Sequence, residues 1–336
     1  MFRLLASAAV ISLSWFPPLP VETLRSVGAL PAHLAGQLEE MTACEQALDG
    51  RYFIFDRRSH TVFAASAARD QIRRIIEIGA ERGRVLRPTA FDLADDGTFV
   101  VADAPGGRGR VQVFHSSGAT LGGFTLGQRE APWIVLNGTV LNGIGSLEYT
   151  GRSVLIGQPE TGALVTEYAL DGRAIRSFGV LRATGQEQDR DVHFALNAGL
   201  TVANPQGGYY FVFLAGTPLF RKYDAAGTLI FERHIEGVQM DSYVRSIPTE
   251  WPRQKSAEGV ELPLVRPGVR AAAVDADGSL WISLTEPFTY IYDRAGDKRR
   301  IVQFRGAGIV APSSLAFTRT GQVLVTPGCY TFQREP

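Results

Sequence analysis

The sequence predicts an all-β protein, a six-bladed β-propeller whose blades are four-stranded antiparallel sheets. The first observation is a polar residue followed by glycine, which recurs six times at intervals of 43–71 residues between short β-rich runs. Such pairs favour tight hairpin turns, because glycine adopts positive φ at little cost. The six pairs are Asp49-Gly50, Asp96-Gly97, Thr150-Gly151, Gln206-Gly207, Asp277-Gly278 and Thr320-Gly321.

A second glycine turn follows inside most of these units. Gly118, Gly172, Gly227 and Gly296 lie 18–21 residues after the first turn of their unit. Two hairpin turns per unit imply four antiparallel strands, and four-stranded units of about 40–50 residues are typical of propeller blades. We therefore expect residues 21–336 to form a single domain, although the length alone would allow two.

Two of the units resemble the NHL repeat, which combines a proline, an Asp-x-Asp-Gly turn, a Val-x-Asp strand end and an arginine-led strand. In the first unit the matching elements are Pro88, Asp95-Asp96-Gly97, Val101-Ala102-Asp103, Arg110–Phe114 and Gly118. The unit from residue 267 is similar, but it has Leu284-Thr285-Glu286 where the family has its aspartate. The resemblance implies a propeller and says almost nothing about activity, because one fold serves many functions.

The last unit has only three strands before the chain reaches Pro336. In propellers of the kind that the resemblance implies, a strand from the other end of the chain completes such a blade. We therefore predict that Val21–Leu30 pairs with Tyr330–Phe332 and closes the last blade. An unfilled position would leave an edge of unpaired backbone groups.

The chain contains two cysteines, Cys44 and Cys329, and we predict that they form a disulfide. Cys44 lies near the start of the first channel strand, and Cys329 lies in a loop at the same face of the last blade. First and last blades are neighbours in a closed ring, which brings these distant positions together. Two separate buried thiols are the alternative, since free cysteine is a common core residue.

The N-terminus and the charge balance restrict where the protein works and what it binds. An arginine followed by the apolar run 4–16 is typical of a signal peptide and is too short to span a membrane. We predict a signal peptide over residues 1–20 and a periplasmic or secreted monomer that does not span the membrane. Lys+Arg 34 balances Asp+Glu 34, which argues against a nucleic-acid partner.

The long insertions all fall on one face of the predicted ring, which we call the top face. This face carries the loops between the second and third strands of each blade and the connections between blades. The longest insertion, residues 236–267, is predicted to form a lid, because long loops in compact folds are often functional. A purely structural cap is the alternative. The candidate ligand-binding residues are His193, Asn197, Tyr243, Trp251, Arg253 and Glu286.

Two classes of function remain open at this point. The first is a binding or scaffolding module that takes a peptide, a glycan or a partner protein through the top face and channel mouth. The second is a metal-dependent lactonase- or esterase-like hydrolase, similar to gluconolactonase-like propellers that hold calcium in the channel. Asn142 and Asn197 could reach that channel, but the Glu-Gly-Pro motif of the template is absent. Zinc is not expected, because no two histidines show ligand spacing, and no catalytic residue is assigned.

Overall fold

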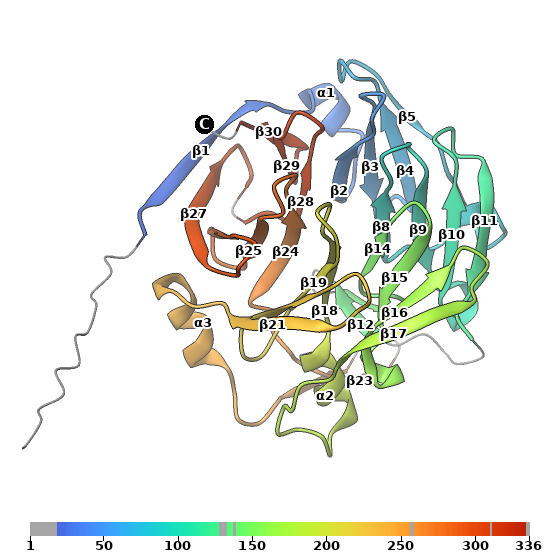
Figure 1. Ribbon diagram of the computed structural model, residues 1–336. Helices are drawn as coiled ribbons and strands as arrows, with labels where there is room; N and C mark the ends of the chain where they lie inside the picture. Colours follow the sequence, from blue (N-terminus) through green and yellow to red (C-terminus); the bar gives the residue numbers. More distant parts are fainter. Residues whose placement is uncertain (1–18, 128–132, 137–138, 256–258, 310, 334–336) are drawn as a thin grey trace, which may run out of the picture.

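The computed structural model describes residues 19–127, 133–136, 139–255, 259–309 and 311–333 (Figure 1). Nearly all of its regular structure is β, and the sheets are arranged around a central axis, which confirms the predicted all-β propeller. The four separate four-stranded sheets consist of β2 (Met41–Gln46), β3 (Tyr52–Asp56), β4 (Thr61–Ala65) and β5 (Ile72–Arg74); β8 (Ala90–Leu93), β9 (Phe99–Asp103), β10 (Arg110–Phe114) and β11 (Thr120–Thr125); β14 (Leu147–Tyr149), β15 (Ser153–Gly157), β16 (Ala163–Ala169) and β17 (Ala174–Val180); and β18 (Gly199–Ala203), β19 (Tyr209–Phe213), β20 (Leu219–Tyr223) and β21 (Leu229–His234).

The rest of the ring is one eight-stranded sheet in the order β24-β25-β26-β27-β1-β30-β29-β28. Its strands are β24 (Val269–Val274), β25 (Leu280–Leu284), β26 (Thr289–Tyr292), β27 (Lys298–Arg305), β1 (Val21–Gly28), β30 (Tyr330–Phe332), β29 (Val323–Thr326) and β28 (Ser314–Phe317). The N-terminal strand β1 therefore lies between two groups of strands from the C-terminal part of the chain (Figure 1).

The predicted pairing of β1 with β30 is confirmed, but it covers only the end of β1. Ser26 lies opposite Phe332 and Gly28 opposite Thr331 in antiparallel register. The longer pairing is parallel, with β27, and runs from Val21 to Arg25. This parallel pairing was not predicted from the sequence, and the strand ends at Gly28 instead of the predicted Leu30. Glu22 helps to hold the parallel register, because its carboxylate accepts a hydrogen bond of 2.9 Å from Arg300 of β27.

Small elements complete the described chain. They are the two-stranded pairs β6 (Glu77–Ile78) with β7 (Arg84–Val85), β12 (Trp133–Leu136) with β13 (Thr139–Asn142) and β22 (Arg253–Lys255) with β23 (Glu261–Pro263), the helices α1 (Ala32–Ala35), α2 (Arg190–Asn197) and α3 (Asp241–Ser246), and three single-turn 3-10 helices. No helix in the described residues is long and apolar enough to cross a membrane. The predicted signal peptide falls almost wholly on residues 1–18, outside the described part of the chain.

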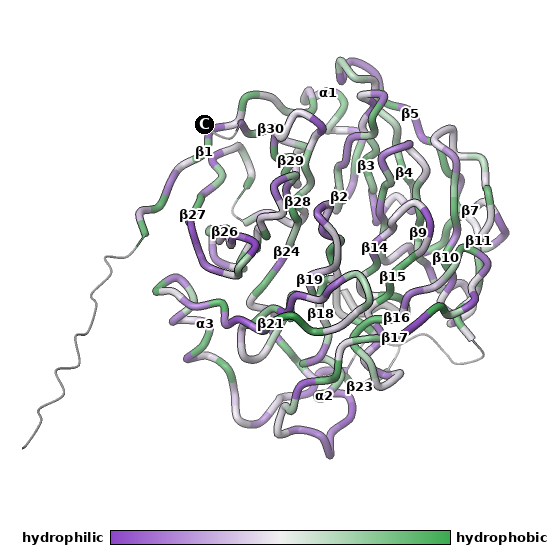
Figure 2. Tube along the Cα trace, viewed as in Figure 1, coloured by the Kyte–Doolittle hydropathy of each residue, from purple (hydrophilic) through white to green (hydrophobic). Residues whose placement is uncertain are grey.

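The core lies between neighbouring sheets and is divided into several clusters. Aromatic rings from adjacent sheets meet across these interfaces, at 5.7 Å for Phe53 and Phe99 and at 4.8 Å for Phe220 and Tyr292. The middle strands supply most buried residues because they are covered on both sides; every residue of β3, β9 and β25 is buried. Figure 2 shows the matching contrast between hydrophobic stretches of strand and the hydrophilic connection that leads into α2.

The predicted glycine turns form as expected. The six turn glycines, from Gly50 to Gly321, have φ between 77° and 103°, a region that other residues adopt at a cost. Gly118, in the second glycine turn of its unit, also has no room for a side chain. A Cβ atom there would lie 1.8 Å from the carbonyl oxygen of Ile75, so this turn packs closely against the preceding sheet. The glycine pattern thus reports both turn geometry and contact between sheets.

The ring closes where the first and last sheets meet. The predicted disulfide between Cys44 of β2 and Cys329 is confirmed, with a Cα–Cα distance of 5.6 Å and both residues buried. Arg69 adds a polar contact across the same junction, since its guanidinium donates to the hydroxyl of Thr331 at 2.9 Å and lies over the ring of Tyr52. Closure therefore combines β1, one covalent bond and one partly buried polar contact.

We expect loss of the disulfide to destabilise the whole ring. The bond joins positions 285 residues apart, so the chain-entropy model gives a contribution of at most about 5–6 kcal/mol. The Cys44→Ala/Cys329→Ala variant and the reduced wild type should both unfold at lower urea concentration than the oxidised protein, by similar amounts. Equal unfolding midpoints for oxidised and reduced wild type would contradict this expectation.

Candidate functional site

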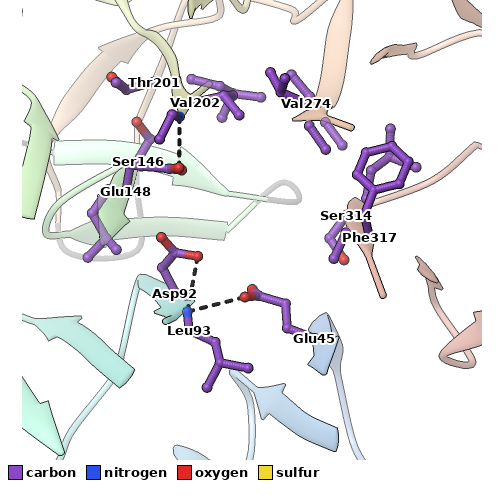
Figure 3. Close-up of a pocket in the computed structure, with 18 of the residues that line it drawn as sticks. Glu45, Asp92, Leu93, Ser146, Glu148, Thr201, Val202, Val274, Ser314 and Phe317 are labelled. Atoms are coloured by element: carbon purple, nitrogen blue, oxygen red, sulfur yellow. Dashed lines mark hydrogen bonds between the residues drawn. The ribbon is translucent and has the colours of Figure 1, made fainter. Parts of the chain in front are cut away.

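A cavity of about 370 Å³ lies on the central axis. It is lined by the innermost strand of each group of strands around the ring, namely β2, β8, β14, β18, β24 and β28 (Figure 3). These strands lie at the inner edges of their sheets, so they present one row of backbone groups to the lumen. Side chains that follow the same row therefore decide what the channel can bind.

Three acidic side chains occupy corresponding positions on three consecutive inner strands. Glu45 of β2 lies opposite Phe53, Asp92 of β8 opposite Val100, and Glu148 of β14 opposite Leu155. All three line the cavity. The corresponding positions on the other three strands, judged by the same pairing, carry Val202, Ala273 and Ala316. At this level, one half of the channel wall is thus acidic and the other half is apolar.

Each acidic side chain binds the backbone of the next inner strand. Glu45 accepts a hydrogen bond of 3.2 Å from the N–H of Leu93, and Glu148 accepts one of 2.7 Å from the N–H of Ala203. Asp92 accepts a hydrogen bond from the N–H of Tyr149. It also accepts one from the N–H of Leu93 (Figure 3). The carboxylates therefore satisfy edge N–H groups that no neighbouring strand can reach, and they connect four successive sheets.

The surroundings of these carboxylates disfavour negative charge. The three side chains are half-buried, because they face the lumen, but they lie deep in the molecule away from bulk solvent. Burial raises the pKa of Asp92 to about 7. Burial, and then repulsion from neighbouring carboxylates, raises the pKa of Glu45 and that of Glu148 well above the ordinary range. The cluster accordingly holds protons at mildly acidic pH and favours positive charge nearby.

The residues predicted from the sequence do not line this cavity. Five of them gather instead in a cap that α2, α3 and the β22–β23 pair form over the loops of the β18–β21 sheet. Pro267, at the end of the long insertion, forms a β-bridge with Ala215 in the loop between β19 and β20. The sixth, Glu286, is exposed in the connection between β25 and β26. Ligand contact by the cap stays a prediction.

Within the cap, most predicted residues have internal partners. Asn197 is fully buried, and its amide bonds the backbone of Arg182 and of His193. The hydroxyl of Tyr243 donates to the carbonyl oxygen of Arg266 at 3.2 Å. Trp251 packs against a buried cluster that contains Val192 and Leu196 of α2.

Two further predicted residues fix α2 at its surface. Arg253 forms ion pairs of 2.7 Å with Asp189 and 3.1 Å with Asp191, and the ring of His193 bonds the hydroxyl of Thr184 at 2.8 Å. These contacts hold β22 and the connection before α2 against the helix.

The channel carboxylates escaped the sequence analysis although a signal for them exists. Glu45 and Asp92 each stand five residues before the glycine of their turn, as do Val202, Ala273 and Ala316. Glu148 stands only three residues before Gly151, because the turn of that unit is shorter. An alignment of units on the turn glycine would have found two of the three.

The structure can be compared with the metal-dependent alternative, in which the channel holds a calcium ion. Among the described residues no three His, Cys, Asp or Glu side chains come together in a way that could hold a metal ion. The side chain of Asn142 lies outside the described residues, and Asn197 is committed to the backbone contacts given above. Asn197 does not line the channel cavity.

Comparison with known proteins supports the fold. The chain resembles solved structures of a streptogramin B lyase and of the virginiamycin B lyase of Staphylococcus aureus, with TM-scores of 0.52 and 0.51. The chain shares their propeller fold. Identity is 9% in both cases, and the alignments cover 86% of this chain and 91% and 80% of the respective lyases. No family model matches the chain, and no curated protein matches it significantly.

The acidic cluster should make the stability of the protein depend on pH. Unfolded carboxyl groups have pKa values near 4, whereas the folded pKa of Asp92 is about 7. The folded state therefore binds more protons between about pH 4 and pH 7, and the contribution of the cluster to stability falls as pH rises through that window.

Glu45→Gln should remove part of this dependence. We expect its melting temperature to exceed that of the wild type by about 2–4 °C at pH 8 and to equal it near pH 5. Glu77→Gln, a change at an exposed position on β6, is the matched control and should follow the wild type. A melting temperature of Glu45→Gln below the wild type at both pH values would show that the hydrogen bond to Leu93 matters more than the charge.

Proposed function

We propose that this protein is an exported six-bladed propeller of NHL-like repeats that binds a small ligand in its central channel. The ligand presents a positively charged, hydrogen-bond-donating group, an amine or a guanidinium, to Glu45, Asp92 and Glu148. The observation that carries the proposal is the cavity on the axis, with three carboxylates on one wall and an apolar wall opposite.

The count of six follows from reading the eight-stranded sheet as two blades. Strands β24–β27 and β28–β30 each repeat the order of the four separate sheets, from an inner strand outward. The strand β1 then serves both groups: it completes the last blade beside β30 and also joins it to β27. Six inner strands around one cavity agree with this interpretation.

Export is supported by the disulfide between Cys44 and Cys329, because such bonds persist in oxidising compartments and are rare in the cytosol. The apolar run 4–16 behind a single arginine supports it independently. The cap formed by α2, α3 and the β22–β23 pair then lies on the top face, where we expect it to limit access to the channel.

The wall chemistry favours an organic cation. Asp92 and Glu45 already share the N–H of Leu93, and the Oε2 atom of Glu148 accepts no hydrogen bond from the described residues. A guanidinium or ammonium group has several hydrogen-bond donors, which can reach carboxylate oxygens on different strands. Opposite them, Val202, Ala273 and Ala316 suit the hydrocarbon stem that carries the cation. The activity named for the two lyases is not carried over, since 9% identity supports the fold alone.

Calorimetric titration of the full chain with n-butylguanidine tests this proposal. We expect binding at pH 8 that weakens at least fivefold at pH 5.5, because protonation neutralises the cluster. Glu148→Gln should weaken binding about tenfold, which corresponds to 1.4 kcal/mol, and Glu77→Gln should leave it unchanged. No binding between pH 5.5 and pH 8 would refute the proposal. Calcium binding that Glu148→Gln abolishes, without binding of n-butylguanidine, would favour the metal-dependent hydrolase instead.

A further inference from the structure

The top end of the same cavity carries an arginine without an ion-pair partner in the described part of the chain. Arg270 lies in β24, is exposed, and lines the cavity. The register of β24 against β25 shifts between Val269 and Ala271, so Arg270 occupies a β-bulge. Bulges occur next to binding sites, where they redirect one side chain. This bulge places a cation at the channel mouth.

The other inner strands carry small, neutral residues at the same level. Counting back three residues from the row that holds the carboxylates gives Thr42, Thr89, Gly145, Gly199 and Ser313. Arg270 is therefore the single charged residue at this level among the six inner strands. Three residues of strand correspond to about 10 Å, which separates Arg270 from the level of Glu45, Asp92 and Glu148.

Two serine hydroxyls at the start of β28 can supply a hydrogen-bond donor at the same level as Arg270. Ser313 and Ser314 both line the cavity, and their hydroxyls lie 2.7 Å and 2.8 Å from that of the buried Thr326. Three hydroxyls have three protons, and the two contacts among them use two. With Thr326 donating to one serine and accepting from the other, the remaining serine proton can donate to a group in the lumen. Together with the guanidinium of Arg270 it suits a carboxylate.

We propose that the channel ligand is a basic amino acid, free or at the C-terminus of a peptide. Its carboxylate binds Arg270 and the serine hydroxyls, and its guanidinium or ammonium group lies among the three channel carboxylates. The inference rests on the proposed function for the cation site at the three carboxylates. It adds a carboxylate site at Arg270. The extended side chain of arginine or lysine joins two opposite charges across a distance of this order, and its stem meets the apolar wall.

The test compares L-arginine with L-arginine methyl ester by calorimetric titration of the full chain at pH 8. The ester keeps the guanidinium but lacks the negative charge of the carboxylate. We expect the wild type to bind L-arginine at least tenfold more tightly than the ester. Arg270→Gln should lower the affinity for L-arginine at least tenfold and leave the ester unchanged. Arg82→Gln, at an exposed position outside the cavity, is the matched control and should behave like the wild type.

The outcomes separate this inference from the proposed function. Equal affinity of the wild type for L-arginine and its methyl ester, or an equal loss for both in Arg270→Gln, overturns the role of Arg270 while cation binding stands. L-norvaline, which has the carboxylate and no guanidinium, tests whether the site at Arg270 binds a ligand without the cation site. If L-norvaline binds in an Arg270-dependent way while n-butylguanidine does not bind, the proposed cation site fails and the mouth site is upheld. Melting temperatures of all variants, compared with the wild type, show whether each is folded.

Discussion

The structure depends on packing each sheet against its two neighbours around a ring. Because the core is divided among these interfaces, an open ring would expose one whole interface between the first and last sheets. The chain prevents this with three kinds of contact at one junction: the backbone pairs of β1, the disulfide between Cys44 and Cys329, and the contact of Arg69 with Thr331. The channel exists only because this junction holds.

The same carboxylates that define the candidate site also connect the sheets. Each of the three carboxylates accepts a hydrogen bond from a backbone N–H group of the next inner strand; they belong to Glu45, Asp92 and Glu148. A charge placed among them changes their protonation, and the hydrogen bonds between sheets respond to the same change. Ligand binding and the stability of this half of the ring are therefore linked through one set of side chains.

Much of the fold could be predicted from the sequence, because turn glycines and alternating strands are local signals. The disulfide followed from the ring, since closure brings Cys44 and Cys329 together. The parallel pairing of β1 with β27 left no local signal, because it depends on where the last sheets meet. The channel site was missed for a similar reason: Glu45, Asp92 and Glu148 are more than 40 residues apart. The long insertion over residues 236–267 favoured Tyr243 and Trp251 as candidates instead.

The position of β1 has a consequence for biogenesis. Its partners β27 and β30 are among the last four described strands to be synthesised, so β1 stays unpaired until they have emerged. Contacts of such long sequence separation form slowly, because closing the loop costs entropy before the contact is gained. The ring is thus completed only after β30 has emerged, and the exposed edges of the earlier sheets need protection from aggregation until then.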